Sequence, residues 1–193
     1  MMASMHAVLI DPPAWFVERR KAMGGDRWDE VWEGVLHMVP PPSFLHAHLG
    51  TKLAVVLTPL AEARGWLVSS EAGLFDPEVG AKDYRQPDLL AVDPAHVSER
   101  GVEGRAELVV EILSPGDESR AKLPFYARHG VREVWLIEPK ARAVEVYTLR
   151  GASYFAVAPE RDGSVRSPLL GLALSTIVGP RLRLSGDAGT TEI

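Results

Sequence analysis

Two acidic residues stand where the sequence otherwise predicts buried strands. Asp88 directly precedes the apolar run Leu89–Val92, and Glu111 lies inside the apolar run Leu108–Leu113. Side chains of a strand alternate between the faces of a sheet, and both faces of the second run are apolar, so we expect Glu111 to be buried. A buried carboxylate must be neutralised, paired or bound to a metal. If the two strands are neighbours, their carboxylates form a site for a hard divalent cation.

These residues also have simpler interpretations, which the spacing alone leaves open. Asp88 follows Pro87 and would serve equally well as a turn cap. Glu111 would be satisfied by a buried ion pair with Arg85 or Lys122, as in cores without catalytic function. Lys122 follows Glu111 by eleven positions in a predicted helix, where lysines are more often exposed.

The elements that must position these residues follow from hydrophobic spacing and from Gly and Pro breaks. We expect a short helix through Trp15, Phe16 and Glu18–Lys21 that ends at Gly24-Gly25, and a long helix from Phe44 to about Arg64. A third helix is expected from Asp117 to His129, with its first turn separated by Pro124. The remaining segments read as strands, which indicates a mixed sheet with a few helices, α/β or α+β. The strands expected outside the two acidic runs are Glu30–Val39 (two strands turning near Gly34), Trp66–Phe75, Val131–Ile137, Val144–Leu149 and Tyr154–Val157.

Composition indicates an ordinary globular chain. Its 193 residues suit one domain, which we expect to span residues 1–185, followed by a flexible tail over 186–193. The net charge of −5 gives no general basic surface, although a nuclease is not excluded, because metal-binding carboxylates add negative charge. The absence of cysteine excludes disulfides and thiolate metal sites.

Further expectations concern location and source. The first residues lack a basic n-region, and no apolar run approaches the length of a membrane span, so we expect a cytoplasmic protein. The sequence has no Asn and a single Gln, Gln86, which fits a thermophilic source.

Seven short motifs occur in an order that resembles a known family. They are E-x-x-x-G at Glu30–Gly34, a Pro-rich break followed by His46, R-x-P-D at Arg85–Asp88, E-x-x-S-P at Glu111–Pro115, K-x-x-x-Y at Lys122–Tyr126, Gly130-Val131, and the strand EVWLIEP. From roughly Glu30 to Tyr147 the chain resembles a bacterial family described as putative restriction endonucleases, within the PD-(D/E)xK nuclease superfamily.

The resemblance implies a restriction-endonuclease-like core, with a mixed central sheet flanked by helices. It implies a Mg²⁺ site, with Mn²⁺ as a possible substitute, on Asp88 and Glu111. The superfamily's simplest motif places a lysine two residues after the second acid, but that position is Leu113 here. The resembling family takes the lysine from the following helix, which makes Lys122 the expected third catalytic residue.

The same interpretation assigns supporting roles and partners. Glu30 is expected to extend the carboxylate shell, and His46 to line the cleft, although a lone histidine is more often an ordinary surface or core residue. Arg120 is expected to contact a backbone phosphate. The expected activity is Mg²⁺-dependent hydrolysis of DNA phosphodiester bonds by a homodimer. The alternative is a catalytically silent DNA-binding or assembly module with the same fold.

Overall fold

The strand that carries Glu111 lies inside a six-stranded sheet, here called the central sheet, in the computed structural model, which describes residues 7–116, 118–187 and 189–193. Strands β9 and β10 pair in parallel, whereas every other neighbouring pair is antiparallel. In spatial order the sheet contains β12 (Ser153–Ala156), β11 (Val144–Arg150), β10 (Glu133–Ile137), β9 (Leu108–Ile112), β7 (Leu89–Val92) and β4 (Leu67–Ser70).

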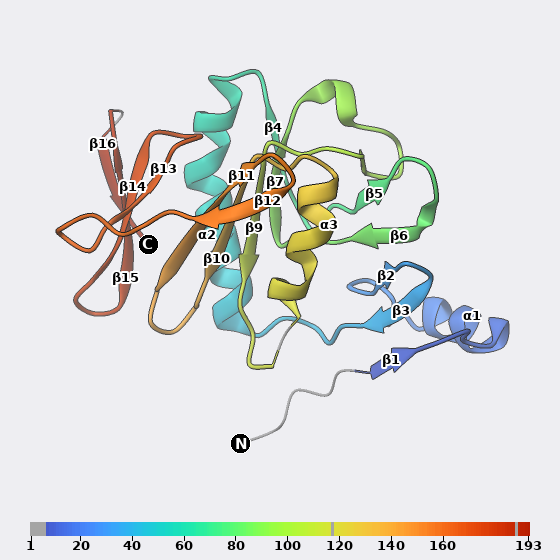
Figure 1. Ribbon diagram of the computed structural model, residues 1–193. Helices are drawn as coiled ribbons and strands as arrows, with labels where there is room; N and C mark the ends of the chain where they lie inside the picture. The colour runs from blue at the N-terminus through green and yellow to red at the C-terminus, as the bar shows by residue number, and fades with distance from the viewer. Residues whose placement is uncertain (1–6, 117, 188) are drawn as a thin grey trace.

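A second six-stranded sheet, the N-terminal sheet, adjoins the central sheet through the chain that joins β6 to β7. Asp88 lies on this three-residue connection, and the acidic residue thus stands where the two sheets meet. The sheet contains β1 (Ala7–Leu9), β3 (Val35–Met38), β2 (Glu30–Trp32), β6 (Gly80–Arg85), β5 (Leu74–Asp76) and β8 (Val102–Glu103). Helix α1 (Ala14–Ala22) lies beside it, away from the central sheet (Figure 1).

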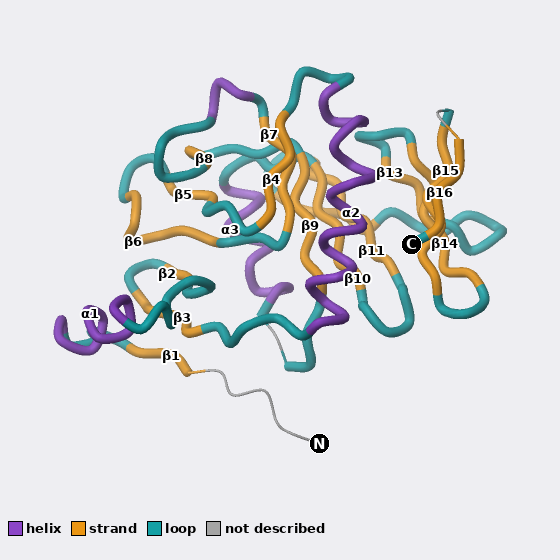
Figure 2. Tube along the Cα trace, turned by 180° about the vertical axis from the view of Figure 1, so that it is seen from behind, coloured by secondary structure: helices purple, strands orange, loops and turns teal. Residues whose placement is uncertain are grey.

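Two helices cover opposite faces of the central sheet (Figures 1 and 2). On one face, α2 (Phe44–Glu62) buries Leu49, Leu53 and Leu57 against the sheet, since residues four apart share one side of a helix. On the other face, α3 (Leu123–Arg128) buries Phe125 and Tyr126. Two short 3-10 helices, η1 (Pro94–His96) and η2 (Ser119–Lys122), complete the helical segments of the described residues.

Helix α2 is the one described helix that is long and apolar enough to cross a membrane, by length and composition only. A core helix passes the same test, and the leucine face of α2 packs on β4, β7 and β9. The observation therefore gives only weak evidence for a membrane span.

The predicted helix over residues 117–129 is divided where Pro124 predicts a separate first turn. Residues Ser119–Lys122 form η2, and α3 begins at Leu123, which places Pro124 in its first turn. Asp117, the expected first residue of the helix, lies outside the described residues. The break sets Lys122 at the junction of the two segments.

The C-terminal region differs from the flexible tail predicted over 186–193. It forms a four-stranded antiparallel sheet, and Ile193 exchanges two backbone hydrogen bonds with Leu182, of 2.8 and 2.9 Å. Leucines on alternate positions of this sheet join the core that α2 covers, which explains why the segment folds. The strands are β13 (Val165–Ser167), β14 (Leu172–Ile177), β15 (Arg181–Gly186) and β16 (Gly189–Glu192).

Candidate active site

Glu111 and Lys122 form the buried centre of the site. Glu111 is 2% exposed on β9 and points to the face that α3 covers. The Lys122 ammonium lies 3.2 Å from both carboxylate oxygens of Glu111, and the Tyr126 hydroxyl donates a hydrogen bond to the same carboxylate. Lys122 and Tyr126 are four residues apart at the junction of η2 and α3, so both reach the strand from one side.

Glu30 joins this centre from the N-terminal sheet. Its Oε1 lies 2.8 Å from Nζ of Lys122 and accepts a 2.8 Å hydrogen bond from the backbone N–H of Gln86. Its Oε2 accepts a 2.7 Å bond from the Trp32 indole. Glu30 is 1% exposed, and these donors supply hydrogen bonds to its buried side chain.

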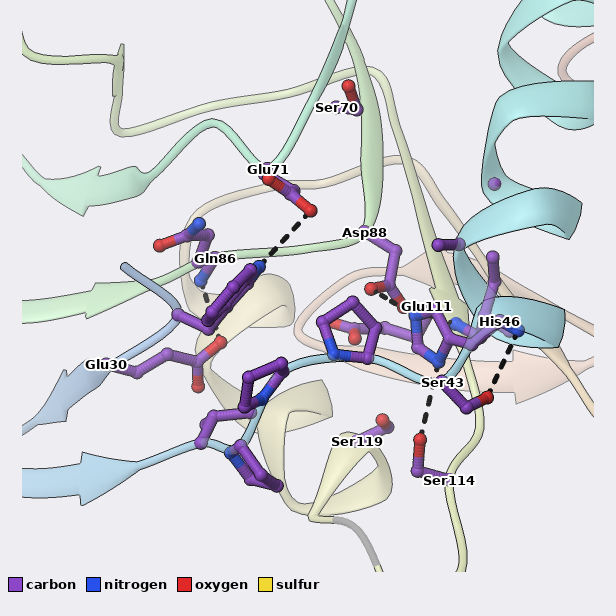
Figure 3. A pocket seen from close by; sticks show the side chains of 18 of the residues that line it. Glu30, Ser43, His46, Ser70, Glu71, Gln86, Asp88, Glu111, Ser114 and Ser119 are labelled. Atoms are coloured by element: carbon purple, nitrogen blue, oxygen red, sulfur yellow. Dashed lines mark hydrogen bonds and ion pairs between the residues drawn. The ribbon is translucent and has the colours of Figure 1, made fainter. Parts of the chain in front are cut away.

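Asp88 is the more accessible acid of the site. The register pairs Leu89 of β7 with Val110 of β9, so Asp88 and Glu111 meet at the same end of two adjacent strands. One oxygen of Asp88 accepts a 2.6 Å hydrogen bond from the Ile112 N–H, and the other lies 2.7 Å from Nε2 of His46. Its side chain is 25% exposed, which leaves it open to the pocket (Figure 3).

The start of α2 positions His46. Ser43 is the N-cap residue, and its hydroxyl accepts a 3.3 Å hydrogen bond from the His46 N–H. Nδ1 of the His46 ring lies 3.3 Å from the Ser114 hydroxyl, while Nε2 faces Asp88. Figure 3 shows His46, Asp88 and Glu111 gathered together, with Glu30 reaching toward them from strand β2 of the N-terminal sheet.

The electrostatics of this group favour a cation. Burial is the largest influence on Glu111 and raises the pKa of its carboxyl to about 8; Asp88 and Glu30 act in the same direction, against Lys122 and the Tyr126 hydroxyl. Burial acts to lower the pKa of Lys122, but the charges of Glu111 and Glu30 outweigh it and raise that pKa. Glu30 and Glu111 thus share one lysine while Asp88 lies beside them, and a bound cation would relieve the repulsion among the three carboxyl groups.

A pocket of about 400 Å³ opens over these groups, within the range of ligand sites. Asp88, Glu111, Lys122, Glu30 and His46 all line it. Among the residues that the structure describes, no three His, Cys, Asp or Glu side chains converge as a preformed metal cage. The volume of the pocket leaves room beside the acids for water or a substrate group, which would supply the remaining ligands of a bound metal ion.

Arg120, the expected phosphate contact, lies outside this group. Its guanidinium forms bonds of 2.8 and 2.6 Å with Glu145 and one of 3.1 Å with the Tyr147 hydroxyl, and it does not line the pocket. The side chain is 53% exposed. The fold brings Glu145 of strand β11 close to Arg120, and the guanidinium is engaged in this ion pair.

Two partners of the carboxylates were not predicted as site residues. Tyr126 stands four residues after Lys122, and this spacing could have assigned it to the same side of the helix. Trp32 stands two residues after Glu30, and strand alternation places both side chains on one face. For both Tyr126 and Trp32, the spacing from a predicted site residue was the feature of the sequence that could have identified them.

Comparison with known proteins decides the family. A family named Uma2 and described as "Putative restriction endonuclease" matches residues 22–178, which is most of the chain. The chain belongs to the Uma2 family. This finding confirms the resemblance inferred from the sequence motifs.

The fold has a counterpart among solved structures. The chain is similar to a crystal structure from Anabaena variabilis described as a putative nuclease, with a TM-score of 0.59 and 20% sequence identity. The alignment covers 74% of this chain and 83% of the other. No curated protein matches the chain. The structural match confirms the predicted restriction-endonuclease-like fold, a mixed sheet flanked by helices.

Proposed function

We propose that this member of the Uma2 family is a metal-dependent deoxyribonuclease that hydrolyses phosphodiester bonds at the Asp88–Glu111–Lys122 group. One observation carries the proposal: the Lys122 ammonium lies 3.2 Å from both oxygens of Glu111, although the strand position two residues after Glu111 is a leucine. A lysine from the helix thus stands beside the second acid. The descriptions of the family and of the similar structure support the same chemistry.

The donors present fit Mg²⁺, with Mn²⁺ as a substitute. Asp88 and Glu111 offer carboxylate oxygens, which hard cations prefer, and the site carries more negative than positive groups. Mg²⁺ commonly uses one or two carboxylates and completes its shell with water and substrate phosphate, so a preformed protein cage is not required. When bound, the ion would supply an activated water and neutralise charge on the phosphate.

The side chains around the acids would keep the reacting groups in position. His46 and the Ile112 N–H hold the two oxygens of Asp88, and Tyr126 holds Glu111. Glu30 keeps the Lys122 ammonium charged and directed at the strand acid. Lys122 would donate to the attacking water or to a phosphoryl oxygen and stabilise the negative charge that develops there.

The reaction is a hydrolysis. The oxygen of water bonds to phosphorus, and the bond from phosphorus to the leaving oxygen breaks. The proton released from water ends on the leaving oxygen, which gives one phosphate monoester and one alcohol. No oxidant or further reactant is consumed.

A cleavage assay tests the proposal. Plasmid, single-stranded and branched DNA are incubated with Mg²⁺ or Mn²⁺, and with a chelator as a blank. Asp88→Asn is expected to abolish cleavage and metal binding by calorimetry, whereas Asp187→Asn, at an exposed position, retains both. Metal and DNA binding without cleavage of any substrate would instead favour the silent-module alternative.

A further inference from the structure

The pocket has an aromatic and proline-rich wall that the chemistry of hydrolysis does not need. Trp28 and the three prolines at 40–42 border the same space as the carboxylates. Helix α2 contributes small side chains to the same lining, Ala47, Gly50 and Ala54. We call the part of the pocket that Trp28, the prolines and these small residues line the slot.

Trp28 is held in this wall by contacts at both its edge and its face. Its indole N–H donates a 3.2 Å hydrogen bond to Glu71, and the Arg27 guanidinium lies over the ring, 5.1 Å from its centroid. Gln86 anchors the same segment by donating a 3.0 Å bond to the Arg27 carbonyl.

The residue that binds the Trp28 indole, Glu71, has an unfavourable backbone conformation. Its φ is 55°, in the left-handed region that non-glycine residues rarely occupy. Such strain gathers at ligand sites, where the surrounding structure enforces it. The Glu71 carboxylate accepts the hydrogen bond from Trp28, and Figure 3 shows Glu71 at the pocket, apart from His46.

Trp32 also lines the pocket, but its ring is already in contact with protein side chains. Its ring is stacked with His37 at 4.0 Å, and the Arg85 guanidinium lies 4.4 Å from its centroid. The indole N–H is engaged by Glu30. The Trp32 ring therefore has two protein groups against it, whereas the Trp28 ring has one, Arg27, so Trp28 is the better candidate for stacking on a ligand.

The charge of the lining disfavours an intact duplex. Proteins that follow duplex DNA place Lys and Arg on its phosphates. Among the described residues that line the pocket, Lys122 is the only lysine or arginine, and Glu30 and Glu111 already bind it. Binding of unpaired strands combines backbone contacts with bases stacked on aromatic side chains, and Trp28 offers the second of these.

We propose that the slot beside Trp28 binds an unpaired nucleotide next to the scissile phosphate, so that the substrate class is single-stranded or frayed-end DNA. This inference rests on the proposed nuclease function and names the substrate of the same site. The base would stack on Trp28 while its phosphate lies at Asp88 and Glu111.

The experiment compares one oligonucleotide sequence as a single strand, as a blunt duplex and as a duplex with an unpaired flap. Cleavage with Mg²⁺ or Mn²⁺ is expected on the single strand and flap, and far less on the blunt duplex. Trp28→Ala is expected to weaken binding of the single strand about 10- to 100-fold, and Trp28→Phe to retain most of it. Trp15→Ala, at an indole that is 63% exposed on α1, is the matched control.

Binding to the Asp88→Asn variant, measured by fluorescence anisotropy, separates the two proposals because it needs no turnover. If no DNA is cut but single strands bind in a Trp28-dependent way, the nuclease function fails and the slot assignment stands. If DNA is cut but blunt duplex is cut equally well, or Trp28→Ala behaves like Trp15→Ala, the slot assignment is overturned. Thermal melting of each variant checks that the fold is retained. If Trp28→Ala is unfolded, Trp28→Leu takes its place, because leucine fills the space without an aromatic ring and should weaken binding in the same way.

Discussion

Lys122 connects two acids that come from different sheets. It is 12% exposed and lies 2.8 Å from Glu30 and 3.2 Å from Glu111. A buried cation shared in this way is expensive to remove, because two carboxylates then face each other without a counter-charge. Lys122 therefore contributes to the stability of the fold as well as to the proposed chemistry, and its effects on unfolding and on cleavage must be measured separately.

We expect Lys122→Ala to lower single-turnover cleavage about 10²- to 10³-fold, with DNA affinity nearly unchanged, because a lost electrostatic contact acts mainly in the transition state. Lys122→Arg should rescue poorly, since a planar fork does not replace a compact ammonium. Lys140→Ala, at an exposed position, is the control for loss of a lysine. A wild-type rate in Lys122→Ala would remove this residue from the mechanism.

At the residue scale, the sequence predicted the acids better than their partners. Asp88 and Glu111 stand out because a charged group in or beside an apolar strand costs free energy unless it is paired, neutralised or bound to a metal. Predicting Lys122 as a site residue required the family resemblance. Its separation of eleven residues from Glu111 does not show whether the following helix brings the lysine back to the strand. The contact between Glu30 and the Gln86 N–H joins residues 56 positions apart, and no local pattern encodes such a meeting.

At the scale of elements, the long helix and the buried strands follow from strong periodicity. Helix α2 begins at Phe44 as predicted and ends at Glu62, close to the expected Arg64. The C-terminal sheet was missed because its strands bury only one face, so that leucines alternate with charged and small residues. Leu182 and Leu184 flank Arg183, for example, and are buried because they join the core that α2 covers.

Glu133 connects this sheet region to the central sheet. The carboxylate is 1% exposed and accepts bonds from the Ser167 hydroxyl (2.5 Å), the Trp135 indole (2.6 Å) and the Leu169 N–H (3.0 Å). Burial raises the pKa of this carboxyl above its ordinary value, although the three donors oppose the shift. A raised pKa in the folded state means that its contribution to stability is present at acid pH and is lost as pH rises through the folded value.

We expect Glu133→Ala to destabilise the fold by about 2–4 kcal/mol, because it leaves three buried donors without an acceptor. Glu133→Gln keeps an acceptor and should cost less. Its stability should fall less than that of the wild type as pH rises, because one of the carboxyl groups with a raised pKa is gone. Urea melts of both variants at pH 5 and pH 8 measure this, with exposed Glu99→Ala as the control. Equal stability of Glu133→Ala and the wild type would exclude a structural role for the contact.

At the scale of the whole molecule, the sequence predicts a homodimer, and a specific edge offers a place to test it. Strand β12 ends the central sheet, and Phe155 on it is 52% exposed. Unpaired sheet edges favour pairing with another chain. We expect a dimer mass in solution at micromolar concentration, shifted toward monomer by Phe155→Lys but not by Val178→Lys, at a position that is 95% exposed. A monomeric wild type, measured by light scattering, would contradict the prediction.

Metal binding should be visible in the stability of the whole protein. A ligand that binds only the folded state stabilises it by about 2.7 kcal/mol at a hundredfold excess over Kd, which for a chain of this size raises Tm by about 5–10 °C. We therefore expect Mg²⁺ or Mn²⁺ to raise Tm, and Asp88→Asn to abolish the rise. An equal rise in the variant would assign the metal to another site.

The size of this rise should depend on pH in a direction that Glu111 sets. Its pKa is about 8 in the metal-free protein, and a carboxyl must lose its proton before it can ligate a metal. Below pH 8 the metal competes with that proton, so its apparent affinity should fall by up to about tenfold per pH unit. We expect a larger Mg²⁺-induced shift in Tm at pH 8 than at pH 6. Glu111→Gln removes the competing proton together with the charge, and should leave a small shift that no longer depends on pH; a wild-type shift that is constant over this range would show that Glu111 does not bind the metal.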